Sequence, residues 1–454
     1  GRSCELVDVI GRGAFGVVWR ALEEGSTDHV AIKVITAKDG AAFVNAAFEA
    51  ELMQILSATC PQSAANMPKY VAHSAAKTCQ ISGAGVVRLA MSYVGGGPLD
   101  KWVYGISDED HKTVDIASLV EGPLPGSRQG SSTVEHACTF TRELLEQLSG
   151  VLVALQPIAF HRDISSHNVL IDFPEGASKP RLCLIDFGLA VRAGSWSRDW
   201  RTANLAGDPR YWTPAAWMAF SFGFKYLTTH TNPGFEHQYL NRIDHFSIGV
   251  LALETFLALL SRADAGDGAG PALAEVRRAW SKYWTVAIHL FQMFHTKGPL
   301  AVRNFITQSK DEGISSLVEY LRHLRHALRA AADQPANKSC ASLLLVLEEL
   351  VAENGTLAWS EIPAMLSEDP FVAGEGESAP GRDVARVGRL LGEATRRLAH
   401  SRIRSTGGAM DQELTRTQPE ISDGDMLSRS TTMPLSADQL SKSFSHRRRS
   451  SGIF

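Results

Sequence analysis

Cysteine is scarce in this sequence of 454 residues, and no two cysteines have metal-binding spacing. The six cysteines occupy positions 4, 60, 79, 138, 183 and 340, without a Cys-x-x-Cys pair. This distribution argues against a four-ligand zinc site and a dense disulfide framework, and it fits a reducing compartment. No secretory signal is visible, so we expect a cytoplasmic, intracellular protein. The first residue is Gly1 rather than Met, which leaves room for an upstream targeting segment.

Neither sign of charge dominates the chain, and no apolar run is long enough to cross a membrane. Lys and Arg number 45 against 49 Asp and Glu, which gives no argument for binding nucleic acid or an acidic membrane. The most apolar run, residues 246–260, is about a helical turn short of a span and contains Glu254. It therefore predicts a buried core helix. Apolar residues make up 44% of the chain, which excludes wholesale disorder.

Trp and Tyr are absent beyond Trp359, and the composition changes near residue 372. Ser, Thr, Gly and Arg become frequent there, which predicts a mostly disordered tail at 373–454. Within the tail, residues 382–404 place apolar side chains at helical spacing. They predict a helix that packs back on the domain or stays frayed, with a membrane-surface or partner helix as the alternative.

The first hundred residues predict strands with one helix. Residues 5–20 and 29–35 are rich in β-branched side chains, 41–58 have helical character, and 86–94 form another apolar strand. The Gly-Gly-Gly-Pro sequence at 95–98 is a strong breaker and a natural hinge between two lobes.

The middle of the chain is expected to be mainly helical after a polar insertion. Residues 105–133 are polar and rich in turn formers, which predicts a surface insertion. A helical pattern covers 139–155, and two short strands follow at 169–171 and 182–185. From there to about residue 371 the pattern is mainly helical, without an internal repeat.

The first chemical motif is rich in glycine. It consists of Gly11, Arg12, Gly13, Ala14, Phe15 and Gly16. Glycines let the backbone approach phosphate groups and direct N–H groups toward them. The residues that follow, Val17 and Val18, favour a strand over a helix, so a dinucleotide-binding Rossmann motif does not fit. A glycine turn between two strands is typical of a flap over a nucleotide.

A lysine follows one strand later, at the end of the Val-Ala-Ile-Lys sequence that finishes at Lys33. From there its ammonium would reach the α- and β-phosphates of a nucleotide. An acidic residue on the next helix should orient it, and both Glu49 and Glu51 qualify. The apolar residues around Glu51 favour that position, although Glu49 fits the helical spacing nearly as well.

Two further motifs supply oxygen atoms suited to a base and a metal. One runs from His161 through Arg162 and Asp163 to Asn168, and the other is the Asp-Phe-Gly sequence that begins at Asp186. Carboxylate and amide oxygens are the ligands that Mg²⁺ prefers. The glycine flap, its lysine and these two motifs follow one another in a fixed order and spacing. Such an arrangement is not expected to arise by chance.

Together these motifs resemble the catalytic domain of eukaryotic-type protein kinases over residues 3–372. Residues 207–214 also resemble the end of an activation segment, and 244–249 resemble the start of the buried central helix. The resemblance implies an α+β fold with two lobes: a small antiparallel β-sheet with one regulatory helix, and a larger, mainly helical lobe. It divides the chain into an N-lobe with hinge at 1–97, a C-lobe at 98–372 and the tail.

The resemblance also implies ATP and Mg²⁺ as cofactors, a protein substrate and a role for each motif residue. Asp163 would accept the proton of the attacking hydroxyl or position it. Lys33, oriented by Glu51, would pair with the phosphates under the glycine flap, and Asn168 and Asp186 would hold the metal. Adenine would lie against Val18, Ala31, Met91, Ser92, Val94 and Leu170, with Met91 as the gatekeeper.

Arg162, next to the catalytic aspartate, suggests control by phosphorylation of the activation segment. A phosphate there would pair with the arginine and order the segment. Ser195, Ser197 and Thr202 are the candidate acceptors. For any one of them, an exposed loop hydroxyl without a regulatory role is the simpler interpretation.

Three features depart from the family pattern. Ser165 stands where Ser/Thr kinases usually have a lysine, and His167 where tyrosine kinases have an arginine, so a phosphate-neutralising charge is absent or partly supplied by histidine. Asp208 replaces the threonine after the activation-segment glycine, and its carboxylate could repel Asp163 or raise its pKa. Ala215 replaces the glutamate that usually anchors the segment, which predicts a different anchor.

None of these changes removes a metal ligand, the phosphate lysine or the base. The sequence therefore favours an active but divergent kinase, with Ser/Thr specificity as the default. Two rival hypotheses stay open: a nucleotide-binding pseudokinase that acts as a scaffold and, less favoured, a small-molecule phosphotransferase of the kinase-like fold. No transmembrane segment or nucleic-acid partner is expected, and the oligomeric state is left open.

Overall fold

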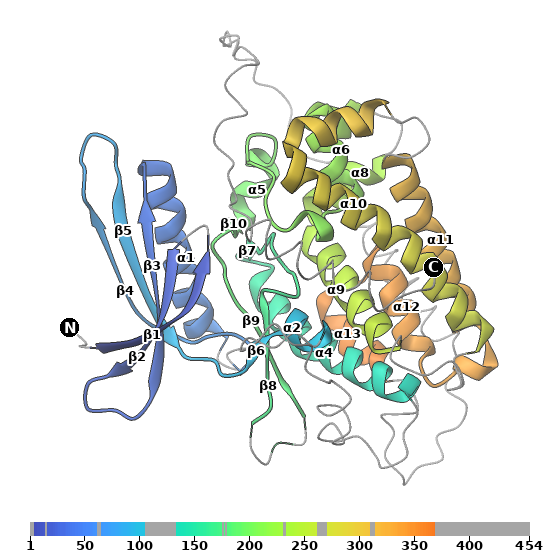
Figure 1. The fold of residues 1–454 in the computed structure, drawn as a ribbon, viewed down its shortest axis with the longest axis horizontal. Coiled ribbons are helices and arrows are strands. Elements are labelled where there is room, and N and C mark those ends of the chain that lie inside the picture. The colour runs from blue at the N-terminus through green and yellow to red at the C-terminus, as the bar shows by residue number, and fades with distance from the viewer. Residues whose placement is uncertain are drawn as a thin grey trace, which may run out of the picture.

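The computed structural model describes residues 4–13, 16–60, 65–104, 133–174, 177, 179–229, 233–260, 270–308 and 314–367. Nearly all of the predicted insertion at 105–133 and the whole predicted tail at 373–454, with its helix at 382–404, lie outside the described residues. Those assignments therefore stay predictions. The described residues form a smaller lobe that is mainly sheet and a larger lobe that is mainly helical (Figure 1).

The sheet of the smaller lobe is antiparallel, and the described part of it has five strands in the order β1-β2-β3-β5-β4. They are β1 (Cys4–Gly13), β2 (Gly16–Glu23), β3 (His29–Ala37), β4 (Tyr70–Lys77) and β5 (Gly85–Ser92). Helix α1 (Gly40–Thr59) packs against the sheet. It begins at Asp39, whose carboxylate accepts a hydrogen bond from the Ala42 N–H at 2.9 Å. Strand β4 was missed by the prediction, because its second half is exposed and lacks an alternating apolar pattern.

The larger lobe is mainly helical, as predicted. Its described α-helices are α2 (Leu99–Tyr104), α4 (Thr133–Leu155), α5 (Ala193–Asp199), α6 (Pro214–Phe222), α7 (Phe224–Thr229), α8 (Pro233–Asn241), α9 (Ile243–Leu260), α10 (Pro271–Gln308), α11 (Ile314–Ala332), α12 (Ala341–Leu350) and α13 (Ile362–Leu366), with 3-10 turns η2 (Pro209–Tyr211), η3 (Pro335–Asn337) and η4 (Trp359–Glu361). Strands β6 (Gly97–Pro98), β8 (Val169–Asp172) and β9 (Arg181–Leu184) form one small sheet, and β7 (Ala159–Phe160) pairs with β10 (Val191–Arg192).

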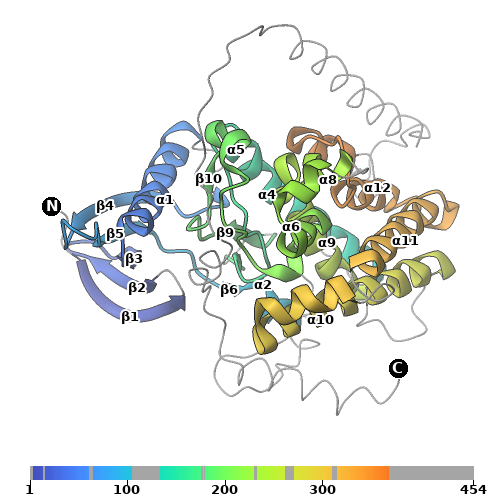
Figure 2. The same cartoon turned by 90° about the horizontal axis from the view of Figure 1, so that it is seen from above.

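Helix α9 forms the centre of the larger lobe, where it packs against α4 and α12 (Figure 2). Among the described helices, α9 alone is long and apolar enough to cross a membrane by length and composition, and 89% of that stretch is buried inside the protein. Phe246, Leu251 and Phe256 are fully buried. The prediction of a buried core helix at 246–260 is thereby confirmed.

The first turn of α9 holds the loop that follows β7. The carboxylate of Asp244 accepts hydrogen bonds from the backbone N–H groups of His161 and Arg162, each at 2.8 Å. Arg162 has a φ of 68°, a left-handed conformation that a residue with a side chain adopts only when its surroundings hold it there. The buried helix therefore fixes the turn directly before Asp163.

Candidate active site

Lys33 lies buried between two carboxylates. Its ammonium donates hydrogen bonds to Glu49 Oε1 and to Asp186 Oδ1, each at 2.7 Å. Only 6% of the Lys33 side chain and 3% of the Glu49 side chain are exposed. Burial alone would lower the pKa of Lys33, but the two carboxylates raise it above its usual value. The lysine therefore stays a cation at neutral pH.

The acid that orients Lys33 is Glu49, so the prediction of Glu51 is wrong. The buried positions of α1 recur every three or four residues and include Ala46, Glu49, Ala50, Met53 and Leu56. Glu51 is about 200° further round the helix than Glu49, which places it on the exposed face. There it forms an ion pair with Arg192, with an N–O distance of 2.7 Å.

The glycine-rich segment is the turn between β1 and β2. Gly13 and Gly16 are opposite each other in this ladder, and Ala14 and Phe15 between them lie outside the described residues. Gly16 has a φ of 151°, and a Cβ atom there would lie 2.2 Å from the carbonyl oxygen of Val34. Glycine is therefore required at this position by the close approach of strand β3.

The residues predicted to contact adenine lie on neighbouring strands and at the hinge. Those of the smaller lobe, on or directly after β2, β3 and β5, are Val18, Ala31, Met91, Ser92 and Val94. Leu170 lies on β8, which pairs with β6 at the end of the hinge. Gly96 in the hinge has a φ of 81°, and a Cβ atom there would lie 1.9 Å from the carbonyl oxygen of Ile171. The hinge therefore passes close against β8.

Asp163 and Asn168 are locked together in the loop between β7 and β8. The Asn168 side-chain amide donates to the backbone oxygen and to Oδ2 of Asp163, both at 2.9 Å. The other carboxylate oxygen, Oδ1, accepts from the backbone N–H of Asp208 at 3.0 Å. Because the amide nitrogen of Asn168 is used in this way, its amide oxygen is left to face a metal.

The donors around Asp186 fit a magnesium ion. Asp186 has a φ of 61°, and its Oδ1 accepts from Lys33 and from the Gly188 N–H at 3.1 Å. A Cβ atom at Gly188 would lie 3.0 Å from that oxygen and 3.3 Å from Lys33 Nζ, so glycine keeps this space open. Among the described residues, no three His, Cys, Asp or Glu side chains cluster as metal ligands. Asn168 and Asp186 would thus be completed by phosphate and water oxygens, as is usual for Mg²⁺.

Burial makes Asp163 an unusually weak acid. It raises the pKa of Asp163 to about 7, with smaller contributions from the negative charges of Asp186 and Asp208, while the hydrogen bonds from Asp208 and Asn168 act in the opposite direction. A carboxylate with a pKa near neutrality is suited to accept a proton at physiological pH.

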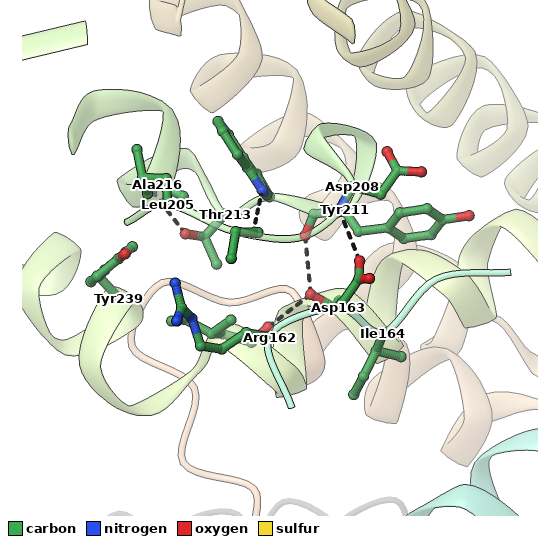
Figure 3. A pocket seen from close by; sticks show the side chains of 13 residues that line it. Arg162, Asp163, Ile164, Leu205, Asp208, Tyr211, Thr213, Ala216 and Tyr239 are labelled. Carbon is green, nitrogen blue, oxygen red and sulfur yellow. Dashed lines mark hydrogen bonds between the residues drawn. The ribbon is translucent and has the colours of Figure 1, made fainter. Parts of the chain in front are cut away.

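The carboxylate of Asp208 turns away from Asp163 (Figure 3). Arg210 donates to it through Nε, at 3.1 Å and 3.0 Å to the two oxygens, and through Nη2. Burial would raise the pKa of Asp208, but the charge of Arg210 keeps it below its usual value. The expected repulsion between Asp208 and Asp163 is therefore reduced by a neighbour that the sequence prediction did not single out.

The departure at Ser165 and His167 also has a partner, which contacts His167. Ser165 is buried and 2% exposed, whereas 38% of the His167 side chain is exposed. His167 Nδ1 lies 2.9 Å from a carboxylate oxygen of Asp100, at the start of α2. Burial would lower the pKa of His167, but its hydrogen bond to Asp100 raises it overall. The Asp100 carboxylate thus favours the cationic form of His167, four residues after Asp163.

The segment with Ala215 is anchored by an amide instead of a carboxylate. The side-chain oxygen of Gln238 on α8 accepts a hydrogen bond from the Ala215 N–H at 3.1 Å. Packing adds to this contact, because Trp212 lies edge-on to Trp217, with 4.9 Å between their ring centroids. The hydroxyl of Tyr211 donates to the buried carboxylate of Glu254. This confirms that the segment is held differently from the usual pattern.

Arg162, predicted as a phosphate ligand, is engaged by its own chain. Its guanidinium donates to the backbone oxygen of Asn204 and lies over the ring of Trp196, 5.0 Å from the centroid. The guanidinium points away from Asp163 and toward Tyr239 (Figure 3). The prediction that a phosphate is its partner therefore does not describe this conformation.

A cavity of about 20 Å³ lies under the activation segment, with Asp163, Asp208, Tyr239 and Ser247 in its lining. That volume holds about one water molecule and no substrate. Neither Lys33 nor any residue of the glycine-rich turn lines this cavity.

A family model described as "Protein kinase domain" matches residues 4–339, which is more than half of the chain. The chain belongs to the protein kinase family, and its two-lobed fold agrees with that membership. No curated protein has a sequence that matches this chain significantly.

Proposed function

We propose that this chain is an active kinase that transfers the γ-phosphate of ATP to Ser or Thr hydroxyls of proteins, with Mg²⁺ as cofactor. The observation that supports it best is the continuous network Glu49–Lys33–Asp186, with both hydrogen bonds at 2.7 Å. It joins the helix of the smaller lobe to the metal aspartate of the larger lobe. A catalytically idle relative would have no need to keep these buried charges aligned, because burying charges is costly.

The smaller and the larger lobe supply different groups that stabilise the charge of the transferring phosphate. The turn with Gly16 covers the phosphates, and the Lys33 ammonium offsets their negative charge. Mg²⁺, when bound, neutralises charge that develops between the β- and γ-phosphates. Asn168 and Asp186 hold it in place. Most of the catalysis is thus positioning and electrostatic stabilisation of the transferring group.

Asp163 receives the proton of the attacking hydroxyl. The N–H of Asp208 and the amide of Asn168 fix both of its carboxylate oxygens, so the base approaches the hydroxyl in a defined orientation. Its pKa of about 7 gives a substantial fraction of the base form at physiological pH. The usual lysine is replaced by Ser165, and the only histidine of this loop after Asp163, His167, is paired with Asp100.

Ser/Thr specificity and a cytoplasmic location are parts of the same proposal. Neither lysine nor arginine stands at the positions that usually distinguish Ser/Thr from Tyr kinases, so the default assignment is kept. None of the six cysteines, all within the described residues, forms a disulfide, which supports a reducing compartment.

The test is γ-phosphate transfer from Mg²⁺-ATP by the full chain to generic protein substrates and to itself, with Asp163→Asn as the matched control. Transfer that disappears in the control, followed by mapping of phosphoserine and phosphothreonine, supports the proposal. Phosphotyrosine alone would overturn the specificity. Thermal stabilisation by Mg²⁺-ATP with no transfer would favour the pseudokinase, and transfer to an aminoglycoside or choline but to no protein would favour the small-molecule enzyme.

A further inference from the structure

The activation segment, residues 186–214, contains an aromatic side chain that packs against Arg162. The indole of Trp196 lies under the guanidinium, 5.0 Å from its carbon to the ring centroid. Trp196 is 2% exposed, and Arg162 is 8% exposed. Burial lowers the pKa of Arg162, which is the expected effect of removing a cation from water. The aromatic face and the Asn204 carbonyl take the place that an anion would otherwise occupy.

Trp196 is itself held by the larger lobe. Its Nε1–H donates to the backbone oxygen of Leu240 at 3.1 Å. The ring lies 5.8 Å from that of Tyr239 on α8 and 6.1 Å from that of Phe160 on β7. Because Phe160 directly precedes the His-Arg-Asp sequence, one side chain connects the activation segment, the catalytic loop and α8.

Trp196 lies in a short helix that is held by backbone hydrogen bonds and aromatic contacts. Its helix, α5, follows β10 directly, and the Trp200 N–H bonds to the Trp196 carbonyl at 3.0 Å. Trp200 is 2% exposed and lies edge-on to Phe224, with 5.8 Å between centroids. These contacts form without a phosphate group on Ser197 or Thr202, whose side chains are exposed.

Two other arginines of the segment, Arg192 and Arg201, already have partners. Arg192 pairs with Glu51 at 2.7 Å and lies over the ring of Phe48 at 4.2 Å. Arg201 lies over the ring of Trp200 at 4.9 Å. To pair with Arg162, Arg192 or Arg201, a phosphate on the segment would have to draw the arginine away from a contact that the structure already makes.

We propose that Trp196 is a positioning residue that replaces an activating phosphate: it covers Arg162, orders the activation segment and so assembles the catalytic loop without phosphorylation. This rests on the proposed kinase activity and adds its regulation. It predicts that the chain is active as synthesised and that Ser195, Ser197 and Thr202 are dispensable for activation.

The first experiment measures kcat and the KM for ATP of the full chain after treatment with a protein phosphatase. We expect rates within about twofold of the untreated protein, and also for the variant with Ser195→Ala, Ser197→Ala and Thr202→Ala. Trp196→Leu should lower kcat by about tenfold or more with little change in KM, because the catalytic loop loses its support. Trp196→Phe keeps a ring over Arg162 and should stay within about threefold.

Trp280→Leu is the control for the loss of a buried indole elsewhere, since Trp280 is 7% exposed on α10 and stacks on Trp284. It should stay within about threefold, with a melting temperature measured for every variant. A tenfold loss after phosphatase treatment, or in the triple alanine variant, would overturn the inference. So would a Trp196→Leu variant that keeps its kcat.

A second readout does not depend on catalysis or on the folding of a variant. Hydrogen exchange in the phosphatase-treated wild-type chain should show protected amides at 200–203, whose N–H groups at Trp200, Thr202 and Ala203 are hydrogen-bonded at 2.9–3.0 Å. Rapid exchange there, next to a protected α9, would overturn the inference. If the wild-type chain transfers no phosphate at all, the proposed function fails, and this exchange experiment alone decides about Trp196.

Discussion

Replacing Glu49 by Gln should lower kinase activity far more than replacing Glu51 by Gln. Both changes exchange a carboxylate for an amide of nearly the same shape on the same helix. The Glu49 side chain is 3% exposed and accepts from Lys33 at 2.7 Å, whereas 51% of the Glu51 side chain is exposed. The two variants therefore separate the buried contact from the surface ion pair with Arg192.

The magnitude follows from the environments of the two carboxylates. A hydrogen bond to a charged group contributes about 1.5–3 kcal/mol, which corresponds to about 10- to 150-fold in rate if it is needed in the transition state. An exposed ion pair contributes about 0–1 kcal/mol. We therefore expect kcat/KM to fall about 10- to 150-fold for Glu49→Gln and to change less than about fivefold for Glu51→Gln.

The loss for Glu49→Gln should not be a consequence of unfolding. Burial, helped by repulsion from Asp186, raises the pKa of Glu49 against the attraction of Lys33, so a neutral amide is tolerated there. The assay measures phosphate transfer at ATP concentrations below KM, together with the melting temperature of each variant. Equal losses in the two variants, or a larger loss for Glu51→Gln, would refute the assignment of Glu49 as the partner of Lys33.

Three further predictions concern the loops of the site. Gly16→Ala should lower stability by about 1–3 kcal/mol, because of its backbone conformation and its close approach to β3, whereas Gly13→Ala, with no atom within 4 Å of the added carbon, should leave the melting temperature unchanged. If the departures only remove a phosphate contact, the double variant Asp208→Thr with Ser165→Lys should keep or raise the transfer rate, whereas a complete loss would show that the site depends on its own arrangement of charges. Asp163→Asn should abolish transfer yet stabilise the metal-free protein. Folding raises the pKa of this acid to about 7, so the ionised carboxylate of Asp163 destabilises the folded state. That destabilisation is absent below the pKa of Asp163 in the unfolded chain and complete above pH 7. Urea unfolding should show a gain of about 1–3 kcal/mol at pH 8 and none near pH 3, and a gain that is independent of pH would contradict this explanation.

Local patterns predicted most of the elements and the motifs of the site but missed β4, and the two-lobed architecture was implied by the resemblance of those motifs to protein kinases. The β-branched runs and the apolar periodicity predicted the sheet, its helix and the buried α9, because each element must hide one face from water. The motif residues Lys33, Asp163, Asn168 and Asp186 were found by type and spacing, since phosphate and metal chemistry restricts the side chains that can serve. The fold confirms that these four residues lie together.

The choice between Glu49 and Glu51 depended on the tertiary structure. Both acids fit the apolar pattern of α1, and the difference lies in how the helix is rotated against the sheet, which distant packing sets. The partners of the divergent residues could not be predicted for the same reason, because no local motif marks them. They are Arg210 beside Asp208, Asp100 beside His167 and Gln238 beside Ala215. The sequence thus identified the chemical groups of a kinase site, while three-dimensional packing decided which charges neutralise one another and why Arg162 rests on Trp196.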